Sequence, residues 1–214
     1  MTMDYRGQLE RGLDELALTL PEAALDRLVQ YLMLLEKWNR AYNLTAVPAQ
    51  KAVSRHLLDS LAVRKFLQGE RFADVGTGAG LPGIPLAITC PDRQFQLLDS
   101  NGKKIRFVTQ AIAELGLDNA RAAQSRVELW RPQPGYDAVL SRAFTSLADM
   151  ARLCEHLLAP NGCLLALKGV YPADELSALP KHFTVDACHP LRVPGVEGQR
   201  HLVVIRPGRA DRTA

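Results

Sequence analysis

The stretch FADVGTGAGLPGIPLA, residues 72–87, constrains the fold of this chain more than any other segment. A short apolar run leads into four glycines between residues 76 and 83, and apolar spacing then resumes. A strand that ends in a glycine turn and opens a helix lets a ligand approach the bare backbone and the helix N–H groups. Residues 78–83 also satisfy Gly-x-Gly-x-x-Gly, a pattern of nucleotide-binding βα units. The stretch therefore predicts a nucleotide site.

After residue 70 the sequence alternates between strand and helix patterns. Strands separated by helices predict βαβ units and a parallel sheet. Residues 182–193 and 200–206 are strand-like with no helix between them, so we expect the sheet to end in an antiparallel hairpin. The predicted fold class is α/β, with a mostly parallel sheet and a small helical N-terminal extension.

The first third of the chain has helical patterns and no strand signal. Thr19 and Glu22 fit a capping box at the start of one helix, and a further helix is expected over residues 49–67. His56 and Asp59 stand three residues apart on one face of that second helix. They could line a site or only complete the packing, and the pattern does not choose between these interpretations.

Composition is that of an ordinary globular protein. Of 214 residues, 47% are apolar and 23% charged, and the net charge is +3. No window approaches the roughly 18 apolar residues of a membrane span, and the N-terminus lacks the apolar centre of a signal peptide. The four cysteines are scattered without metal-ligand spacing. We therefore expect buried thiols, no metal site, no membrane contact, a cytoplasmic location and a monomer.

An acidic residue closes the second predicted strand. Asp99 stands nineteen residues after Gly80, where a carboxylate would bind the ribose hydroxyls of NAD or of S-adenosylmethionine (SAM). Pro82 and Pro85 remove N–H groups that a pyrophosphate would need, and no residue pattern for hydride transfer stands out. These features favour SAM over NAD. The alternative without a ligand is a glycine turn that only tightens strand-to-helix packing.

Several motifs along the chain resemble the GidB family. They occur in order as LEKWNRAYNLTA, RHLLDSL, ADVGTGAGLPGIPLA, LLDSNGKKIRF, QSRVE, LSRAF, LKG and GQRHLVVIR. That family comprises bacterial methyltransferases that modify N7 of guanine 527 in 16S ribosomal RNA. The resemblance implies a class I SAM-dependent methyltransferase (Rossmann-like) fold, with S-adenosylhomocysteine (SAH) as product. We divide the chain into a helical N-terminal extension (1–69), a SAM-binding methyltransferase domain (70–207) and a flexible tail (208–214).

The resemblance also implies which residues contact the cofactor. The matching positions are Gly76, Gly78, Leu81, Asp99, Val127, Glu128 and Arg142. The two glycines would pass beneath the methionine and ribose parts of SAM, and Leu81 would cover it. The Val127–Glu128 pair would hold the adenine, and Arg142 would close the site after the fourth strand.

Each of three charged positions has a structural alternative. Asp99 could instead cap the helix that starts near Gly102. Glu128 could be a surface acid, and Arg142 could pair with a structural carboxylate such as Asp74. The sequence alone keeps these alternatives open.

The end of the fourth strand, SRAF, bears on the acceptor atom. A ring carbon of cytosine needs a nucleophilic cysteine there, and an exocyclic amine is usually handled by an Asn/Asp-Pro-Pro-aromatic turn; the sequence has neither at this position. Guanine N7 carries a lone pair and no proton, so its methylation is an in-line displacement that depends on positioning. We therefore predict no catalytic acid or base.

Basic residues gather near predicted loops and helix ends. The candidate RNA contacts are Lys103, Lys104, Arg106, Lys168 and Arg200. The first three fall in the first turn of a helix, where the macrodipole disfavours cations and phosphate contact would explain them. A solvated surface charge is the alternative for each.

The acceptor base must expose its Hoogsteen edge, which favours an unpaired or flipped-out guanine. Trp130 or Phe144 could stack on it, or belong to the core. The acceptor could be naked 16S ribosomal RNA or an assembled small-subunit particle. A non-catalytic RNA-binding module with the same fold is the remaining alternative to an enzyme.

Overall fold

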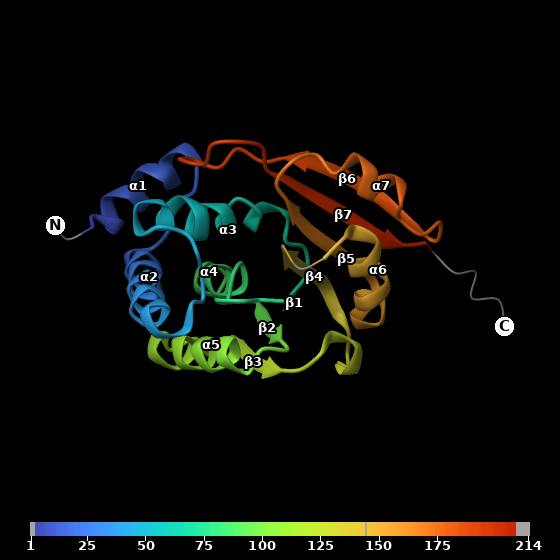
Figure 1. Cartoon of the computed structure of the whole chain (residues 1–214), viewed down its shortest axis with the longest axis horizontal. Helices are drawn as coiled ribbons and strands as arrows, with labels where there is room; N and C mark the ends of the chain where they lie inside the picture. Colours follow the sequence, from blue (N-terminus) through green and yellow to red (C-terminus); the bar gives the residue numbers. More distant parts are fainter. Residues whose placement is uncertain (1–2, 144, 209–214) are drawn as a thin grey trace.

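The computed structural model describes residues 3–143 and 145–208. Seven strands form one sheet in the order β3-β2-β1-β4-β5-β7-β6 (Figure 1). The strands are β1 (Arg71–Val75), β2 (Gln94–Asp99), β3 (Ala120–Gln124), β4 (Tyr136–Arg142), β5 (Leu158–Lys168), β6 (Phe183–Pro190) and β7 (His201–Pro207). Of the predicted tail, only Gly208 belongs to the described residues.

The five strands from β1 to β5 are parallel, and β7 runs in the opposite direction to its two neighbours. β7 pairs antiparallel with β5 on one side and with β6 on the other. The predicted mostly parallel sheet with a terminal antiparallel hairpin is therefore confirmed. The chain winds from β1 outward to β2 and β3, then returns to place β4 on the other side of β1. The carboxyl ends of β1 and β4 thus form the switch point at which open α/β sheets bind ligands.

Helices cover both faces of this sheet. The α-helices are α1 (Tyr5–Glu15), α2 (Glu22–Tyr42), α3 (Asp59–Leu61), α4 (Gly83–Thr89), α5 (Gly102–Leu115), α6 (Leu147–Cys154) and α7 (Ala173–Ser177). In Figure 1, α1 to α5 gather on one side of the sheet, and α6 and α7 lie on the other. Short 3-10 turns occur at η1 (Ala49–Lys51), η3 (Arg64–Phe66), η4 (Val127–Leu129) and η5 (Glu155–Leu157), and η2 (Val53–Leu58) is a π-helix.

The strands are apolar on both faces because both faces are covered. In β1, Phe72 packs into the hydrophobic cluster beneath α1 to α5, whereas Ala73 and Val75 pack into the cluster beneath α6. Side chains alternate between the faces of a strand, so a strand buried on both sides reads as a nearly continuous apolar run. The helices before β1 share their cluster with α4 and α5. The predicted division at residue 70 stays a prediction.

The N-terminal helices differ in detail from the predicted ones. The capping box is wrong: α2 begins at Glu22, with Pro21 at the N-cap position and no side-chain cap within the described chain. Glu22 pairs instead with the guanidinium of Arg6 on α1. The helix expected over 49–67 is present as successive segments of different winding, η1, η2, α3 and η3. Within the described ranges, no helix has the length and apolar character that crossing a bilayer requires.

Candidate functional site

Two cavities open at the carboxyl ends of the parallel strands. The large cavity has a volume of about 870 Å³ and lies over β1, β2 and the start of η4. Its walls include Gly76, Asp99, Lys104, Val127 and Glu128. The small cavity, of about 440 Å³, lies between η2, β4, β5 and the start of β7. Ala143, directly after β4, lines both, so the two cavities adjoin there.

The glycine loop after β1 forms one wall of the large cavity. Gly76, Gly78 and Gly80 adopt φ values of 66°, 61° and 86°, which residues with a Cβ atom rarely adopt. Beneath the loop, Asp74 Oδ2 accepts hydrogen bonds from Thr77 Oγ1 at 2.6 Å and from Gly83 N at 2.9 Å. Burial raises the pKa of Asp74 to about 6. These contacts fix the turn that the sequence predicted.

Asp99 connects this loop to the second strand. The side chain is only 7% exposed, and it lines the large cavity. Its Oδ2 accepts from Gly78 N at 3.0 Å, and its Oδ1 accepts from Asn101 N at 2.9 Å. The ammonium of Lys104 lies 3.6 Å from Oδ2. Asn101, whose side chain accepts from Lys103 N, is the cap of α5. Asp99 therefore keeps carboxylate lone pairs directed at the cavity.

The other predicted cofactor residues lie in different places. Val127 and Glu128 line the large cavity on η4, and Gly76 lines it from the loop. Gly78 contacts Asp99 through its N–H. Leu81 is 4% exposed and packs in the hydrophobic cluster below the loop. The structure therefore brings Gly76, Asp99, Val127 and Glu128 together around one cavity and places Leu81 in the core.

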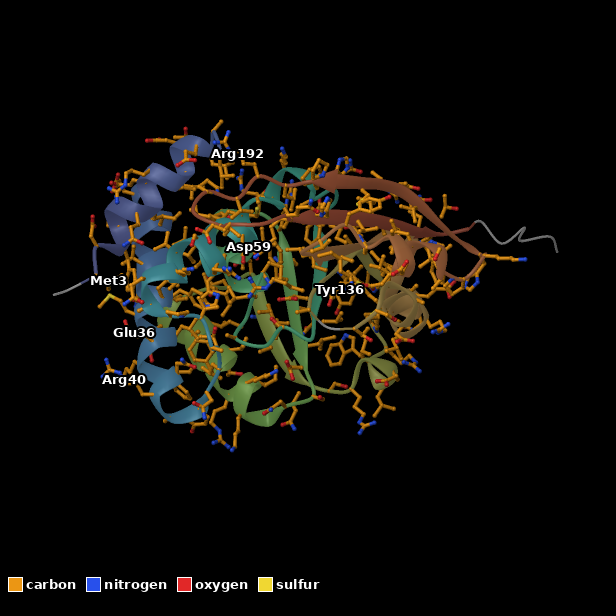
Figure 2. The ribbon with its side chains drawn as sticks, turned by 45° about the horizontal axis from the view of Figure 1, so that its top comes forward. Met3, Glu36, Arg40, Asp59, Tyr136 and Arg192 are labelled. Carbon is orange, nitrogen blue, oxygen red and sulfur yellow. The ribbon has the colours of Figure 1, made fainter. Side chains whose placement is uncertain are left out.

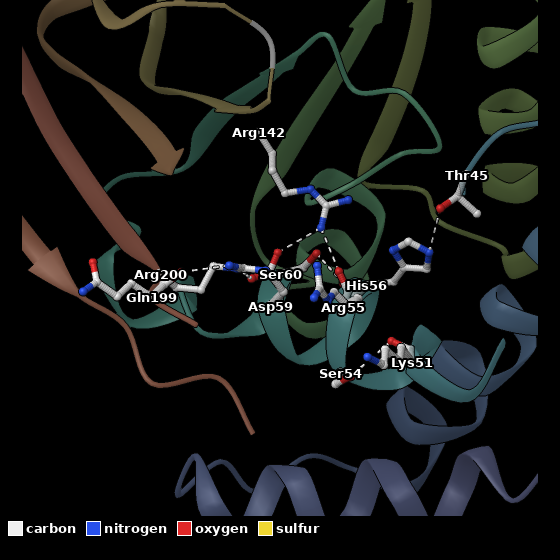
Figure 3. A network of polar contacts seen from close by, with 10 residues as sticks. All are labelled: Thr45, Lys51, Ser54, Arg55, His56, Asp59, Ser60, Arg142, Gln199 and Arg200. Carbon is white, nitrogen blue, oxygen red and sulfur yellow. Dashed lines mark hydrogen bonds and ion pairs between the residues drawn. The ribbon is translucent and has the colours of Figure 1, made fainter. Parts of the chain in front are cut away.

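Arg142 belongs to the small cavity. Its Nη1 donates to Asp59 Oδ2 at 3.0 Å and to the carbonyl oxygen of Arg55 at 3.0 Å (Figure 3). Arg200 Nε donates to the other oxygen, Asp59 Oδ1, also at 3.0 Å. Arg142 does pair with a carboxylate, but the partner is Asp59 and not Asp74.

Asp59 is shielded from solvent by this arrangement. Asp59 is buried, and Figure 2 labels it near the middle of the view, whereas Arg40 and Arg192 lie at the rim. One carboxylate between two guanidinium groups offsets much of the positive charge at the small cavity. Sequence reasoning singled out Asp59 but did not assign its partners, which stand 83 and 141 residues further along the chain.

His56 lines the small cavity beside this network. The side chain is 3% exposed, and Nε2 lies 3.2 Å from Thr45 Oγ1. No hydrogen-bond partner for Nδ1 is found within residues 3–143 and 145–208. Burial, together with the charge of Arg142, lowers the pKa of His56 to about 4. The imidazole is therefore neutral at pH 7.

The predicted RNA-binding residues divide into exposed and paired cations. Lys103 and Arg106 are exposed on the first turns of α5. Lys104 faces Asp99 at the large cavity. Lys168 donates to Glu175 Oε2 at 2.7 Å, which fixes its ammonium at the small cavity.

The two aromatic candidates for stacking have different outcomes. Trp130 is half-buried, and its Nε1 donates to Tyr136 Oη at 3.0 Å. Phe144 lies outside the described residues. Over the described ranges, no group of three or more His, Cys, Asp or Glu residues could hold a metal ion.

A known protein family and individual proteins match most of this chain. The sequence profile of the GidB family, described as rRNA small subunit methyltransferase G, matches residues 24–203. The chain belongs to the GidB family. A relative from Salmonella arizonae, named ribosomal RNA small subunit methyltransferase G, is 52% identical over 204 residues, which is 94% of this chain and 98% of that protein. A relative of the same name from Pseudomonas syringae pv. tomato is 51% identical over 207 residues, 96% of this chain and 98% of that protein.

Solved structures support the fold. A SAM-dependent methyltransferase from Aquifex aeolicus matches with a TM-score of 0.57 at 17% identity, covering 79% of this chain and 96% of that one. The DhpI–SAH complex matches with a TM-score of 0.53 at 18% identity, covering 87% and 98%. Identities this low show the fold alone. The two structures show that this chain has the class I methyltransferase fold that the sequence predicted.

Proposed function

We propose that this chain transfers the methyl group of SAM to N7 of guanine 527 in 16S ribosomal RNA. Membership of the GidB family, whose members carry the name rRNA small subunit methyltransferase G, supports a ribosomal RNA acceptor. One structural observation carries the proposal. A cavity of cofactor size and a smaller charged cavity meet at Ala143, at the switch point of the sheet.

The walls of the large cavity fit SAM. The Asp99 carboxylate, held by two backbone N–H groups, presents lone pairs to a ribose diol. Gly76 gives the methionine part close access to the backbone, and Val127 and Glu128 provide an apolar surface and an acceptor for adenine. When bound, SAM supplies an electrophilic methyl group. Leu81 packs in the core beneath the loop, and Arg142 lies at the small cavity, next to Ala143.

The small cavity fits a purine acceptor. N7 of guanine attacks with its own lone pair, so the protein needs to position the base and has no proton to remove. The purine gains positive charge as the methyl group is transferred. Electrostatic repulsion of that charge is reduced by the carboxylate of Asp59, which lies between Arg142 and Arg200, and by the neutral state of the His56 ring.

The RNA is held mainly through its phosphates. Lys103 and Arg106 provide exposed cations on α5, the helix whose Lys104 lines the large cavity, and phosphate contacts of this kind make binding salt-dependent. Lys104, Lys168 and Arg200 then act at the cavity walls, where each faces a carboxylate. We further infer that the protein works as a cytoplasmic monomer on the small-subunit RNA or particle.

Methyl transfer from labelled SAM tests the proposal. Small-subunit particles, and naked 16S ribosomal RNA, are taken from cells that lack the gene and are incubated with the protein. After digestion, the label is expected in 7-methylguanosine. Label in another nucleoside, or no label in either substrate, would contradict the proposal. The Asp99→Ala protein at the same concentration is the control for cofactor-dependent transfer.

A further inference from the structure

One side chain of the N-terminal extension, Tyr31 of α2, reaches the glycine loop. Helix α2 packs against α4 and α5 beside the sheet (Figure 1). The side chain of Tyr31 is fully buried, and its ring centroid lies 6.3 Å from that of Phe107 on α5. Its hydroxyl donates to the carbonyl oxygen of Ala79 at 2.7 Å. Ala79 stands between Gly78 and Gly80 of the loop, so a buried hydroxyl joins the extension to the loop backbone.

The Ala79 carbonyl depends on this hydroxyl. The neighbouring N–H groups of Gly80 and Leu81 both donate to the carbonyl oxygen of Thr77, at 2.9 and 3.0 Å. No second donor to the Ala79 oxygen is found in residues 3–143 and 145–208. A buried carbonyl group that loses its donor costs free energy, because water cannot replace the hydrogen bond. The loop conformation at this point is therefore held by Tyr31.

The same loop segment is connected to the large cavity on its other side. Gly78 N donates to Asp99 Oδ2 at 3.0 Å, and Asp99 lines the cavity. Gly78 and Gly80 flank Ala79 with φ values of 61° and 86°, and glycine loses more conformational freedom on ordering than any other residue. Such a segment needs contacts from outside to keep one conformation. Asp99 supplies one from the cavity, and Tyr31 supplies one from the helical layer.

We propose that Tyr31 is a positioning residue for SAM, whose hydroxyl fixes the Ala79 carbonyl and so holds the glycine loop in the conformation that the cofactor binds. This inference rests on the proposed cofactor site at the large cavity. A loop that is already ordered loses less conformational entropy when its ligand binds, and affinity is higher for that reason. The N-terminal extension then contributes to cofactor binding, although the large cavity is lined by residues between 75 and 143.

Removing a single oxygen atom tests this role. Tyr31→Phe keeps the buried ring and leaves the Ala79 carbonyl without its donor. Tyr5→Phe is the matched control, because Tyr5 is also a buried tyrosine of the extension and its hydroxyl donates to Glu36 Oε2 at 3.1 Å, between α1 and α2. Asp99→Ala reports on the proposed cofactor site itself. For wild type and the three variants we compare SAH binding by calorimetry, KM for SAM, kcat on small-subunit particles, and urea unfolding.

The effect of Tyr31→Phe should appear in cofactor affinity. The dissociation constant of SAH and the KM for SAM should both rise about three- to tenfold, which corresponds to about 0.7–1.4 kcal/mol. The kcat at saturating SAM should stay within about twofold of wild type, because the bound cofactor orders the loop. Tyr5→Phe should also lower the free energy of unfolding, but leave SAH affinity and KM unchanged. A hydroxyl with a role in stability alone would alter unfolding in both variants and SAH affinity in neither.

The failures of the two ideas can be distinguished. Wild-type SAH affinity in Asp99→Ala would contradict the proposed cofactor site. Weakened SAH binding by Asp99→Ala, together with wild-type SAH affinity and KM in a folded Tyr31→Phe protein, would overturn the inference alone. Equal losses of SAH affinity in Tyr31→Phe and Tyr5→Phe would overturn it as well.

A measurement on the wild type carries the test if Tyr31→Phe does not fold. Binding and a contact that favours it are reciprocally linked, so SAH should stabilise the contact between α2 and the loop. Amide hydrogen exchange around residue 31 should then be slower with SAH than without it. Equal exchange in the two states would overturn the inference.

Discussion

Replacing Asp99 by alanine should weaken SAH binding strongly. In the proposed complex the carboxylate accepts hydrogen bonds from the ribose hydroxyls, and a hydrogen bond to a charged group contributes about 1.5–3 kcal/mol. At about 1.4 kcal/mol for each factor of ten, the dissociation constant should rise about 10- to 150-fold. Isothermal titration calorimetry with SAH measures this change directly.

Asp99 also holds the glycine loop, so the folded state must be measured as well. Its oxygens accept from Gly78 N and Asn101 N, and removing both acceptors leaves two N–H groups unpaired. This should destabilise the fold by about 2–4 kcal/mol in urea unfolding. Asp99→Asn keeps one acceptor and should fall between the two proteins in both measurements. The exposed Asp118→Ala variant is the control. An SAH affinity of Asp99→Ala within threefold of wild type would refute the ribose assignment.

Three further predictions concern RNA binding, the buried ion pairs and pH. Changing Lys103 and Arg106 to alanine should make the plot of log K against log salt shallower by about 1.4, whereas Lys168→Ala, whose charge is paired, should leave the slope unchanged; equal slopes for both proteins would contradict the phosphate contacts. Asp59→Asn should lower the free energy of unfolding by about 2 kcal/mol. This is less than for a fully buried ion pair, because the two arginine side chains are 23% and 21% exposed. A urea unfolding curve identical to that of the wild type would contradict this prediction. The pKa of Asp74 is about 6 in the folded protein, against an ordinary value of 3.8, so the unfolded chain releases this proton at lower pH than the folded protein. As pH rises from 4 to 6, the free energy of unfolding of the wild type should therefore fall by up to about 3 kcal/mol relative to that of Asp74→Asn. Parallel stability curves for the two proteins would contradict this last prediction.

The sheet could be predicted because its signals are local. The change from helical spacing to alternating strands and helices at residue 71, and the missing helix before residue 200, follow from contiguous sequence. The start of α2, in contrast, could not be predicted from local sequence. Glu22 is held by Arg6 of another helix, a contact that no capping pattern contains.

The large cavity was predictable for a similar reason. Its glycine loop and Asp99 lie at the ends of consecutive strands, and the carboxyl ends of parallel strands meet at one edge of a sheet. Leu81 shows the limit of this reasoning, because the turn that carries it directs its side chain into the core.

The small cavity could not be predicted in this way. It joins residues from η2, the end of β4 and the start of β7, which are far apart in sequence. The sequence suggested Lys168 and Arg200 as phosphate contacts because it does not reveal their carboxylate partners. Glu175, the partner of Lys168, lies on another element, and Asp59, the partner of Arg200, is far away in the sequence. One signal was present: His56 and Asp59 are two ionisable residues among the leucines of the helical motif HLLDSL. Such a pair on a buried face needs partners, and here the partners form the site.

A crystal structure with SAH bound tests the central claim most directly. We predict the adenosine in the large cavity, with both ribose hydroxyls on Asp99 and the sulfur directed at Ala143 toward the small cavity. SAH bound elsewhere, or a large cavity that accepts a pyrophosphate-containing dinucleotide in preference to SAH, would contradict it.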